Sequence, residues 1–550
     1  MQSEASHPAL TQLHDALAKC RQAPEDVKLQ QASSRLLSDL ATQGQPLLAT
    51  YHPVVDELLV ALLRGNAVSH QTLALIAVSQ LRSKYQIDRE TDPADQQPLL
   101  VSLAQDILFL ETLNRTVNTD PEFEDFLRKL RRFLLFESRR PTGVSPQLIP
   151  LTAALAQQCF NNEYILMEED DERILVNDVE TECARELRRD PVQASQMLLL
   201  VLGMYRFPAR LPSADTIANI PLTTFPEPVR PVIARMIHQP LEENRLRDDI
   251  PSFAGVTSTT SKMVRAQYEE NPYPRWFSLG GPFSALETRL KRIRPDFSWP
   301  TAFLHEFRIL VPGCGTGQQP LAIARGNPDA DVVAIDLSKA SLAYGKRMAG
   351  SLGIRNVTFL HGDLAEVSKL QERFHHIDCV GVLHHMADPT AGWRSLAGAV
   401  LSGGTLHLGL YSRVARLQID FIRAQVKRLA LEASAEGMKA LRQQILTGEQ
   451  YKPLFQALNT PGFYNLGSFR DLFFHVQERS YTLSEIRQLI DLLNLEFLGF
   501  KISSPILKSK YRERFPDDPR MNNFDNWCQF ESSYMGTAVM FDFWLRKPES

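Results

Sequence analysis

The stretch that most constrains this chain is a glycine-rich turn between two short apolar runs, within residues 307–336. The first apolar run is 309–311, the turn at 313–317 reads Gly-Cys-Gly-Thr-Gly, and a helical pattern follows it. The second apolar run, 332–335, ends in an acid, Asp336. Strand, tight turn, helix, strand and acid in this order predict the first half of a nucleotide-binding βαβ unit.

The spacing of this unit has a physical reason. Glycines let the backbone bend sharply and approach a ligand without a Cβ in the way, and the turn presents N–H groups at a helix N-terminus. Asp336 follows Gly317 by 19 residues and can accept hydrogen bonds from both hydroxyls of a ribose. The glycine pattern is G-x-G-x-G, not the G-x-G-x-x-G typical of dinucleotide sites, which favours S-adenosylmethionine (SAM) over NAD.

The segment VPGCGTGQ at 311–318 resembles motif I of the class I SAM-dependent methyltransferases. The resemblance implies an α/β, Rossmann-like domain with a seven-stranded, mostly parallel sheet, SAM as cofactor and S-adenosylhomocysteine as product. Asp336 matches the family's ribose-binding acid, and Asp363 matches the acid that contacts the adenine amino group. Val311 stands where the family usually has an acid, so the SAM amino group has no assigned partner.

Three further segments carry resemblances. GVLHHM at 381–386 resembles the end of the fourth strand, beside the transferable methyl group. YEENPYPRW at 268–276 is similar to a signature ahead of the methyltransferase domain in a bacterial family that often carries tetratricopeptide repeats. Segments 155–164 and 239–243 resemble other parts of that family, so the resemblance covers most of the chain from about residue 50.

The signature at 268–276 places three aromatics, Tyr268, Tyr273 and Trp276, just before the first strand. Aromatic faces stabilise a cationic sulfonium, which suggests a lid over the SAM pocket; the alternative is that they only pin the linker to the core. The expected SAM-binding residues are Tyr268, Tyr273, Arg275, Trp276, Gly313, Cys314, Gly315, Gly317, Gln318, Asp336, Leu337, Asp363, Leu364 and Val382.

Methyl transfer is an in-line displacement that depends chiefly on positioning, and a base is needed only when the nucleophile carries a proton with an unfavourable pKa. The candidate catalytic residues are His384, His385, His475, Glu478 and Tyr481. Alternatively, one imidazole of the pair His384 and His385 only forms a hydrogen bond with the backbone. His475 and Glu478, three residues apart, could be a base with its orienting partner or a local surface pair. No second pair at ligand spacing stands out, so no metal is predicted.

The domain organisation follows from hydrophobic periodicity. Residues 1–250 show apolar residues at helical spacing and predict an all-α N-terminal domain. Residues 251–306 read as a linker with the lid, and 307–550 as the methyltransferase domain. An insertion at 412–481, after the fifth strand, is placed to build a substrate pocket.

Within the last domain, helices are expected at 364–374 and 414–446. The last two strands are expected at 495–502 and 537–545, antiparallel by the superfamily's usual order. The polar segment 503–531 between them is expected to close the other side of the pocket.

Composition excludes several classes of protein. The net charge of −4 gives no reason to expect a nucleic-acid partner. Six scattered cysteines without a C-x-x-C pair indicate a reducing compartment and no structural zinc. No signal pattern begins the chain, and its longest strongly apolar run, 197–202, is too short to span a bilayer, so a cytoplasmic protein is expected. The oligomeric state stays open.

Three functional hypotheses follow. The first is methylation of O or N on a small molecule or peptide bound under the 412–481 insertion. The second is methylation of a protein partner recruited by residues 1–250, and the third is a SAM-binding scaffold without turnover. A basic cluster in the helical region is either a solvated helix face or a binding patch; it comprises Arg128, Lys129, Arg131, Arg132, Arg139 and Arg140.

Overall fold

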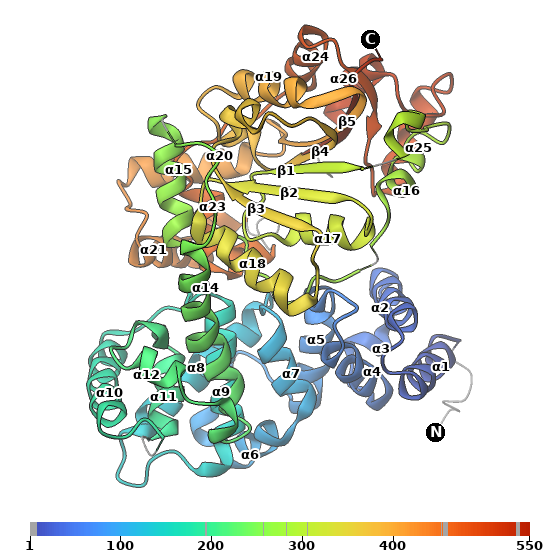
Figure 1. The fold of residues 1–550 in the computed structure, drawn as a ribbon. Helices are drawn as coiled ribbons and strands as arrows, with labels where there is room; N and C mark the ends of the chain where they lie inside the picture. The colour runs from blue at the N-terminus through green and yellow to red at the C-terminus, as the bar shows by residue number, and fades with distance from the viewer. Residues whose placement is uncertain are drawn as a thin grey trace. The chain divides into compact units, whose positions relative to one another are not determined.

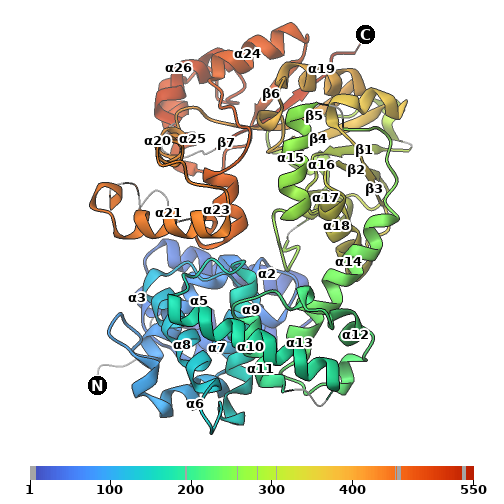
Figure 2. The same cartoon turned by 90° about the vertical axis from the view of Figure 1, so that its left-hand side faces the viewer.

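The computed structural model describes residues 8–192, 195–256, 258–281, 283–304, 306–452, 454, 460–534 and 540–549. The chain forms two compact units that interleave along the sequence. Unit 1 comprises Met1–Glu242, Trp276–Pro282 and Leu431–Arg470, and unit 2 comprises Glu243–Arg275, Phe283–Ala430 and Asp471–Ser550. The domain boundaries expected from the sequence, 1–250, 251–306 and 307–550, stay a prediction. Figures 1 and 2 show the course of the chain.

Unit 1 is helical, which confirms the all-α prediction for the N-terminal region. Its helices are α1 (Pro8–Gln22), α2 (Val27–Thr42), α3 (Pro46–Ala49), α4 (Pro53–Arg64), α5 (Ala74–Tyr85), α6 (Gln97–Gln105), α7 (Ile107–Arg115), α8 (Pro121–Ser138), α9 (Ile149–Asn161), α10 (Asp170–Arg189), α11 (Gln196–Gly203), α12 (Ala214–Ala218), α13 (Arg230–Ile233) and α21 (Ala435–Thr447). Two helices, α14 (Gln239–Asp248) and α23 (Leu466–Phe473), run from one unit into the other. No helix in the described part of the chain is long and apolar enough to cross a bilayer.

The residues of the basic cluster in unit 1 form ion pairs with acidic residues of the same unit. Arg131 is fully buried beside Glu172, and Arg132 pairs with Asp171. The other four basic residues also lie within ion-pair distance of a carboxylate. The cluster therefore does not present a row of unpaired positive charges, and the structure gives no support to a binding patch there.

Unit 2 contains one seven-stranded sheet of order β3-β2-β1-β4-β5-β7-β6. Its strands are β1 (Arg308–Pro312), β2 (Asp331–Asp336), β3 (Val357–His361), β4 (Phe374–Val380), β5 (Val400–Tyr411), β6 (Glu496–Phe500) and β7 (Met540–Arg546). Strand β7 pairs antiparallel with both β5 and β6, and the other strand pairs of the described sheet are parallel. This confirms the predicted α/β Rossmann-like fold (Figure 1). The predicted start of the last strand, Thr537, lies outside the described residues.

The helices of unit 2 are α15 (Thr259–Glu270), α16 (Leu286–Lys291), α17 (Gln318–Gly326), α18 (Lys339–Leu352), α19 (Pro389–Ala399), α20 (Leu417–Arg428), α24 (Leu483–Leu492), α25 (Pro505–Arg514) and α26 (Phe524–Tyr534). Helix α18 shows why they form where they do. The Ser338 side chain accepts from the N–H of Ser341 at its start, and Gly353 ends it with a φ of +66°.

Two predicted helices are corrected by the structure. The segment 364–374 is a short 3₁₀ helix, Leu364–Leu370, because Gln371 adopts a left-handed φ of 56° and Phe374 already begins β4. The segment 414–446 is two helices, α20 and α21. Ala430 between them has a left-handed φ of 48°, and Ser434 caps the second helix by accepting from the N–H of Gly437.

The segment 503–531 does not close the pocket as predicted. It forms α25 and α26, whose apolar side chains enter the hydrophobic core of unit 2 beside β6 and β7. Tyr511 and Trp527 stack there with ring centroids 4.1 Å apart, and both are almost fully buried. This segment therefore stabilises the antiparallel edge of the sheet.

Candidate functional site

A cavity of about 350 Å³ lies in unit 2 at the carboxyl ends of the parallel strands. Its walls come from α15 and the segment after it, the turn after β1, the ends of β2 to β5, and the end of α23. Of the predicted SAM-binding residues, those that line it are Tyr268, Tyr273, Gly313, Cys314, Gly315, Gln318, Asp336, Leu337, Asp363, Leu364 and Val382. Gly317, Arg275 and Trp276 do not belong to this lining.

The glycine turn is tight enough to require glycine at two positions. Gly315 has a φ of +53°, and a Cβ on it would lie 2.6 Å from the carbonyl oxygen of Tyr273. A Cβ on Gly313, whose φ is +65°, would lie 2.5 Å from the side chain of Val382. Both positions therefore hold backbone at a distance that any side chain would prevent.

Asp336 ends β2 and lies directly against this turn. Its Oδ2 accepts from the N–H of Gly315 at 2.8 Å, and its Oδ1 accepts from the N–H of Ser338 at 2.8 Å. Burial raises the pKa of Asp336 to about 6, although these backbone N–H groups stabilise the carboxylate and oppose the shift. The carboxylate keeps further acceptor capacity toward the cavity, as a ribose-binding acid requires.

The predicted lid is anchored on helix α18. Glu269 accepts from the N–H groups of Lys339 and Ala340 at 2.9 and 3.2 Å, at the positive end of that helix. The rings of Tyr268 and Tyr273 stack with centroids 6.4 Å apart, and both line the cavity. The structure thus brings two of the three aromatics to the cavity, as a lid would need.

The cavity wall beyond the β4 end contains His385. Its Nδ1 lies 2.8 Å from the carbonyl oxygen of Gln477, which assigns the ring proton to Nδ1 and leaves Nε2 as an acceptor. The ring stacks on His475, with centroids 3.8 Å apart. Burial lowers the pKa of both histidines, that of His475 to about 2, so both rings are neutral at pH 7.

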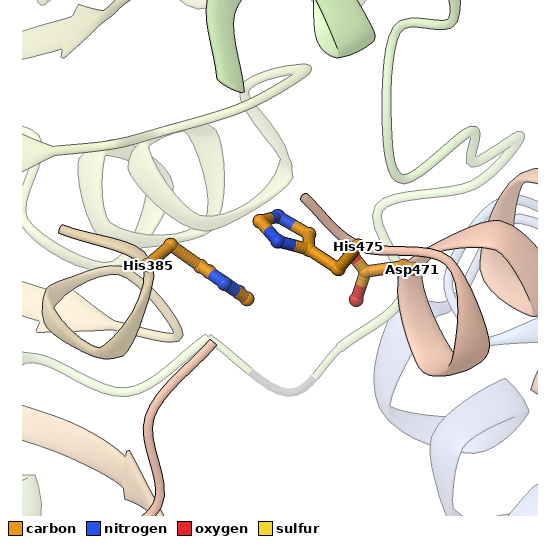
Figure 3. Close-up of side chains that lie close together, drawn as sticks. All are labelled: His385, Asp471 and His475. Carbon is orange, nitrogen blue, oxygen red and sulfur yellow. The ribbon is translucent and has the colours of Figure 1, made fainter. Parts of the chain in front are cut away.

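Asp471, near the end of α23, was not foreseen from the sequence. Its Oδ1 accepts from the Tyr268 hydroxyl at 2.8 Å, and that hydroxyl lies 3.1 Å from Nε2 of His475. Figure 3 shows His385 approaching from one side, and His475 and Asp471 from the other. The one usable signal was the four-residue spacing of Asp471 and His475, although α23 ends at Phe473 and His475 follows it in the chain. Tyr411 and Met386 also line the cavity without having been predicted to do so.

Of the five predicted catalytic residues, His385 alone belongs to the described lining of the cavity, and His475 stacks against it without being part of that lining. His384 is buried against the ring of Tyr411, at 3.8 Å between centroids. Glu478 accepts from Nη2 of Arg416 at 2.6 Å and from Nη2 of Arg423 at 2.8 Å, so it serves a buried ion pair and does not orient His475. Tyr481 is buried in the core of unit 2.

Comparisons with known proteins agree with this geometry. Residues 309–404 match a family described as a methyltransferase domain. An uncharacterised protein of Synechococcus sp. is 29% identical over 272 residues, which cover 45% of this chain and 62% of that protein. A ubiquinone biosynthesis O-methyltransferase of Xanthomonas campestris is 29% identical over 140 residues, 25% of this chain and 57% of that enzyme. The chain thus spans about three fifths of the length of these two relatives.

Among solved structures, PKMT2 from Rickettsia typhi in complex with AdoHcy is similar, with a TM-score of 0.37 and 16% identity over 48% of this chain and 54% of that one. The family match covers β1 to the middle of β5, the part of unit 2 that carries the glycine turn and Asp336. Unit 2 therefore contains a region, residues 309–404, that matches a methyltransferase domain.

Proposed function

We propose that the chain is a SAM-dependent methyltransferase that moves a methyl group to O or N of a small molecule or peptide. The observation that carries the proposal is Asp336. Its carboxylate lies at the tip of β2, is bonded to the N–H of Gly315 in the glycine turn, and lines the cavity. Asp336 would accept hydrogen bonds from the ribose hydroxyls of SAM, and Asp363 would accept a hydrogen bond from the adenine amino group.

The acceptor would bind at the end of the cavity near His385, Tyr411 and Met386. Its nucleophile would approach the methyl group opposite the leaving sulfur, in line. His385 would take the proton of the nucleophile on Nε2, because Nδ1 is held by Gln477. His475 would position His385 by stacking on it.

The resemblance to the repeat-associated bacterial family is part of the same proposal. Two residues of its signature segment, Tyr268 and Tyr273, line the cavity, which supports a cofactor-binding role for that segment. Methylation of a protein recruited by residues 1–250 is the weaker alternative, since the basic cluster of unit 1 is matched by acids.

Calorimetric titration with S-adenosylhomocysteine tests the cofactor assignment. Asp336→Ala is expected to raise the dissociation constant roughly a hundredfold, since two hydrogen bonds to a charged acceptor are worth about 1.5 kcal/mol each. Asp517→Asn, at an exposed position of unit 2, is the control and should bind like the wild type. Equal affinity of Asp336→Ala and wild type would remove the assignment.

Binding should also depend on pH in a defined direction. The pKa of Asp336 is raised to about 6, so lowering the pH through 6 protonates the carboxylate and removes one of its acceptor oxygens. We expect S-adenosylhomocysteine to bind about tenfold more weakly at pH 5 than at pH 7, as the ionised fraction falls. The Asp336→Asn variant should bind weakly at both values. A wild-type affinity that stays constant over this range would contradict the prediction.

A further inference from the structure

Asp471 is a buried carboxylate that has no ion-pair partner in the part of the chain that the structure describes. Its side chain lines the cavity and is 7% exposed, and Oδ1 accepts from the Tyr268 hydroxyl. Among the described residues, no lysine or arginine side chain forms an ion pair with it. The nearby guanidinium of Arg423 donates to the backbone oxygen of Asp471 and pairs with Glu478, so its charge attracts the Asp471 carboxylate without forming an ion pair with it. A buried carboxylate without a counter-charge is costly unless a ligand supplies one.

The surroundings of Asp471 suit an organic cation. Three tyrosines, Tyr268, Tyr273 and Tyr411, line the same cavity, and aromatic faces attract cations. Within the described lining there are three carboxylates and neither lysine nor arginine. Two of these carboxylates, Asp336 and Asp363, lie at the ends of β2 and β3, where the ribose and adenine of SAM are proposed to bind. The third, Asp471, is left for a different group.

A metal ion fits this cluster less well. His385, Asp471 and His475 each offer a ligand atom, and these atoms lie within 4.8 Å of one another. However, Nδ1 of His475 accepts from the N–H of Gln477, which places the ring proton on Nε2 and blocks the nitrogen that faces Tyr268. The two imidazole planes differ by only 24° in a face-to-face stack, so their in-plane lone pairs do not converge on one point.

We propose that Asp471, with the rings of Tyr268, Tyr273 and Tyr411, forms a binding site for an organic ammonium group. Asp471 supplies the charge through its carboxylate, and the Tyr268 hydroxyl fixes the orientation of that carboxylate. The inference rests on the proposed function, because it assumes that this cavity takes SAM.

Two molecules of the reaction can supply the ammonium group. One is SAM itself, through its α-ammonium. The other is an amine acceptor. In that case the ammonium would first lose a proton to Nε2 of His385, and the nitrogen lone pair would then form the new C–N bond. The S–CH₃ bond would break with its electron pair returning to sulfur, which gives the methylated ammonium and S-adenosylhomocysteine.

The first arm of the test asks whether the α-ammonium group of SAM occupies the site. The full chain and Asp471→Asn are titrated with S-adenosylhomocysteine and with 5′-deoxy-5′-methylthioadenosine, which lacks the amino-acid part. Asn keeps the oxygen that accepts from Tyr268 but removes the charge. A tenfold weaker affinity for S-adenosylhomocysteine, with methylthioadenosine binding changed less than twofold, assigns the site to the α-ammonium of SAM. Because a misfolded variant would lose both ligands, the second ligand is the internal control.

The second arm of the test asks whether the ammonium group of an amine acceptor occupies the site. Protein saturated with S-adenosylhomocysteine is mixed with n-butylamine or with n-butanol, its uncharged counterpart, and binding is read by saturation-transfer NMR. Binding of the amine alone, lost in Asp471→Asn and kept in Asp517→Asn, assigns the site to an amine acceptor.

Two results would overturn the inference. One is an Asp471→Asn variant that matches the wild type in both arms. The other is micromolar Zn²⁺ binding to the wild type that is lost in Asp471→Asn and in His475→Phe, which would make the cluster a metal site. A wild type that binds neither adenosyl ligand would instead defeat the proposed function, and this inference with it.

Discussion

Replacing Glu478 by alanine is expected to lower the free energy of unfolding by about 3–5 kcal/mol and the melting temperature by roughly 10 °C. The carboxylate bridges Arg416 and Arg423, and the side chains of Glu478 and Arg416 are each 1% exposed. Removing the acid would leave two guanidinium groups in or near the core without a counter-charge. Differential scanning calorimetry of the full chain measures the effect.

The control for this prediction is an ion pair at the surface. Asp491→Ala breaks the contact of Asp491 with Arg487, whose side chains are 58% and 39% exposed, and should change the melting temperature by no more than about 1 °C. If Glu478→Ala kept its melting temperature but lost methyl transfer, Glu478 would regain the catalytic role that the sequence suggested.

Replacing His385 by glutamine is expected to lower kcat about a hundredfold or more, with an acceptor identified by screening with labelled SAM. Glutamine can still donate to the carbonyl oxygen of Gln477 but cannot take up a proton at neutral pH. Affinity for S-adenosylhomocysteine should stay within about threefold of the wild type. Since the pKa of His385 lies below its ordinary value, wild-type activity should not decline from protonation of this ring until the pH is well below 6.5.

The control variant for His385 is His14→Gln, the same chemical change at an exposed position of unit 1. It should retain wild-type turnover. A His385→Gln variant with normal kcat would show that the acceptor loses its proton without this base, either to solvent or before it binds.

The parts of the fold that were predictable from sequence depend on local chemistry. The β1–turn–α17–β2 unit was recognisable because glycines, an apolar run on each side and Asp336 fall within one short stretch. The helix predicted at 364–374 was wrong because a left-handed residue, Gln371, interrupts a pattern of apolar spacing that would also suit a helix.

The residues at the acceptor end of the site were harder to predict from the sequence, because contacts between distant parts of the chain determine which side chains lie there. Glu478 and His475 have the spacing of a catalytic pair, yet the Glu478 carboxylate forms ion pairs with Arg423 of α20 and with Arg416, which directly precedes that helix. Asp471 reaches the cavity only through the position of α23 and its bond to Tyr268, which precedes it by about 200 residues. No local pattern marks such a contact.

The interleaving of the two units limits how the chain can be divided. The backbone passes from unit 1 to unit 2 after Glu242, Pro282 and Arg470, and returns after Arg275 and Ala430. No single cut therefore releases either unit whole, since a fragment ending at 242 lacks two pieces of its own unit. Limited proteolysis would yield fragments that stay together until denatured, and a gene fusion or domain exchange at one junction would leave both units incomplete.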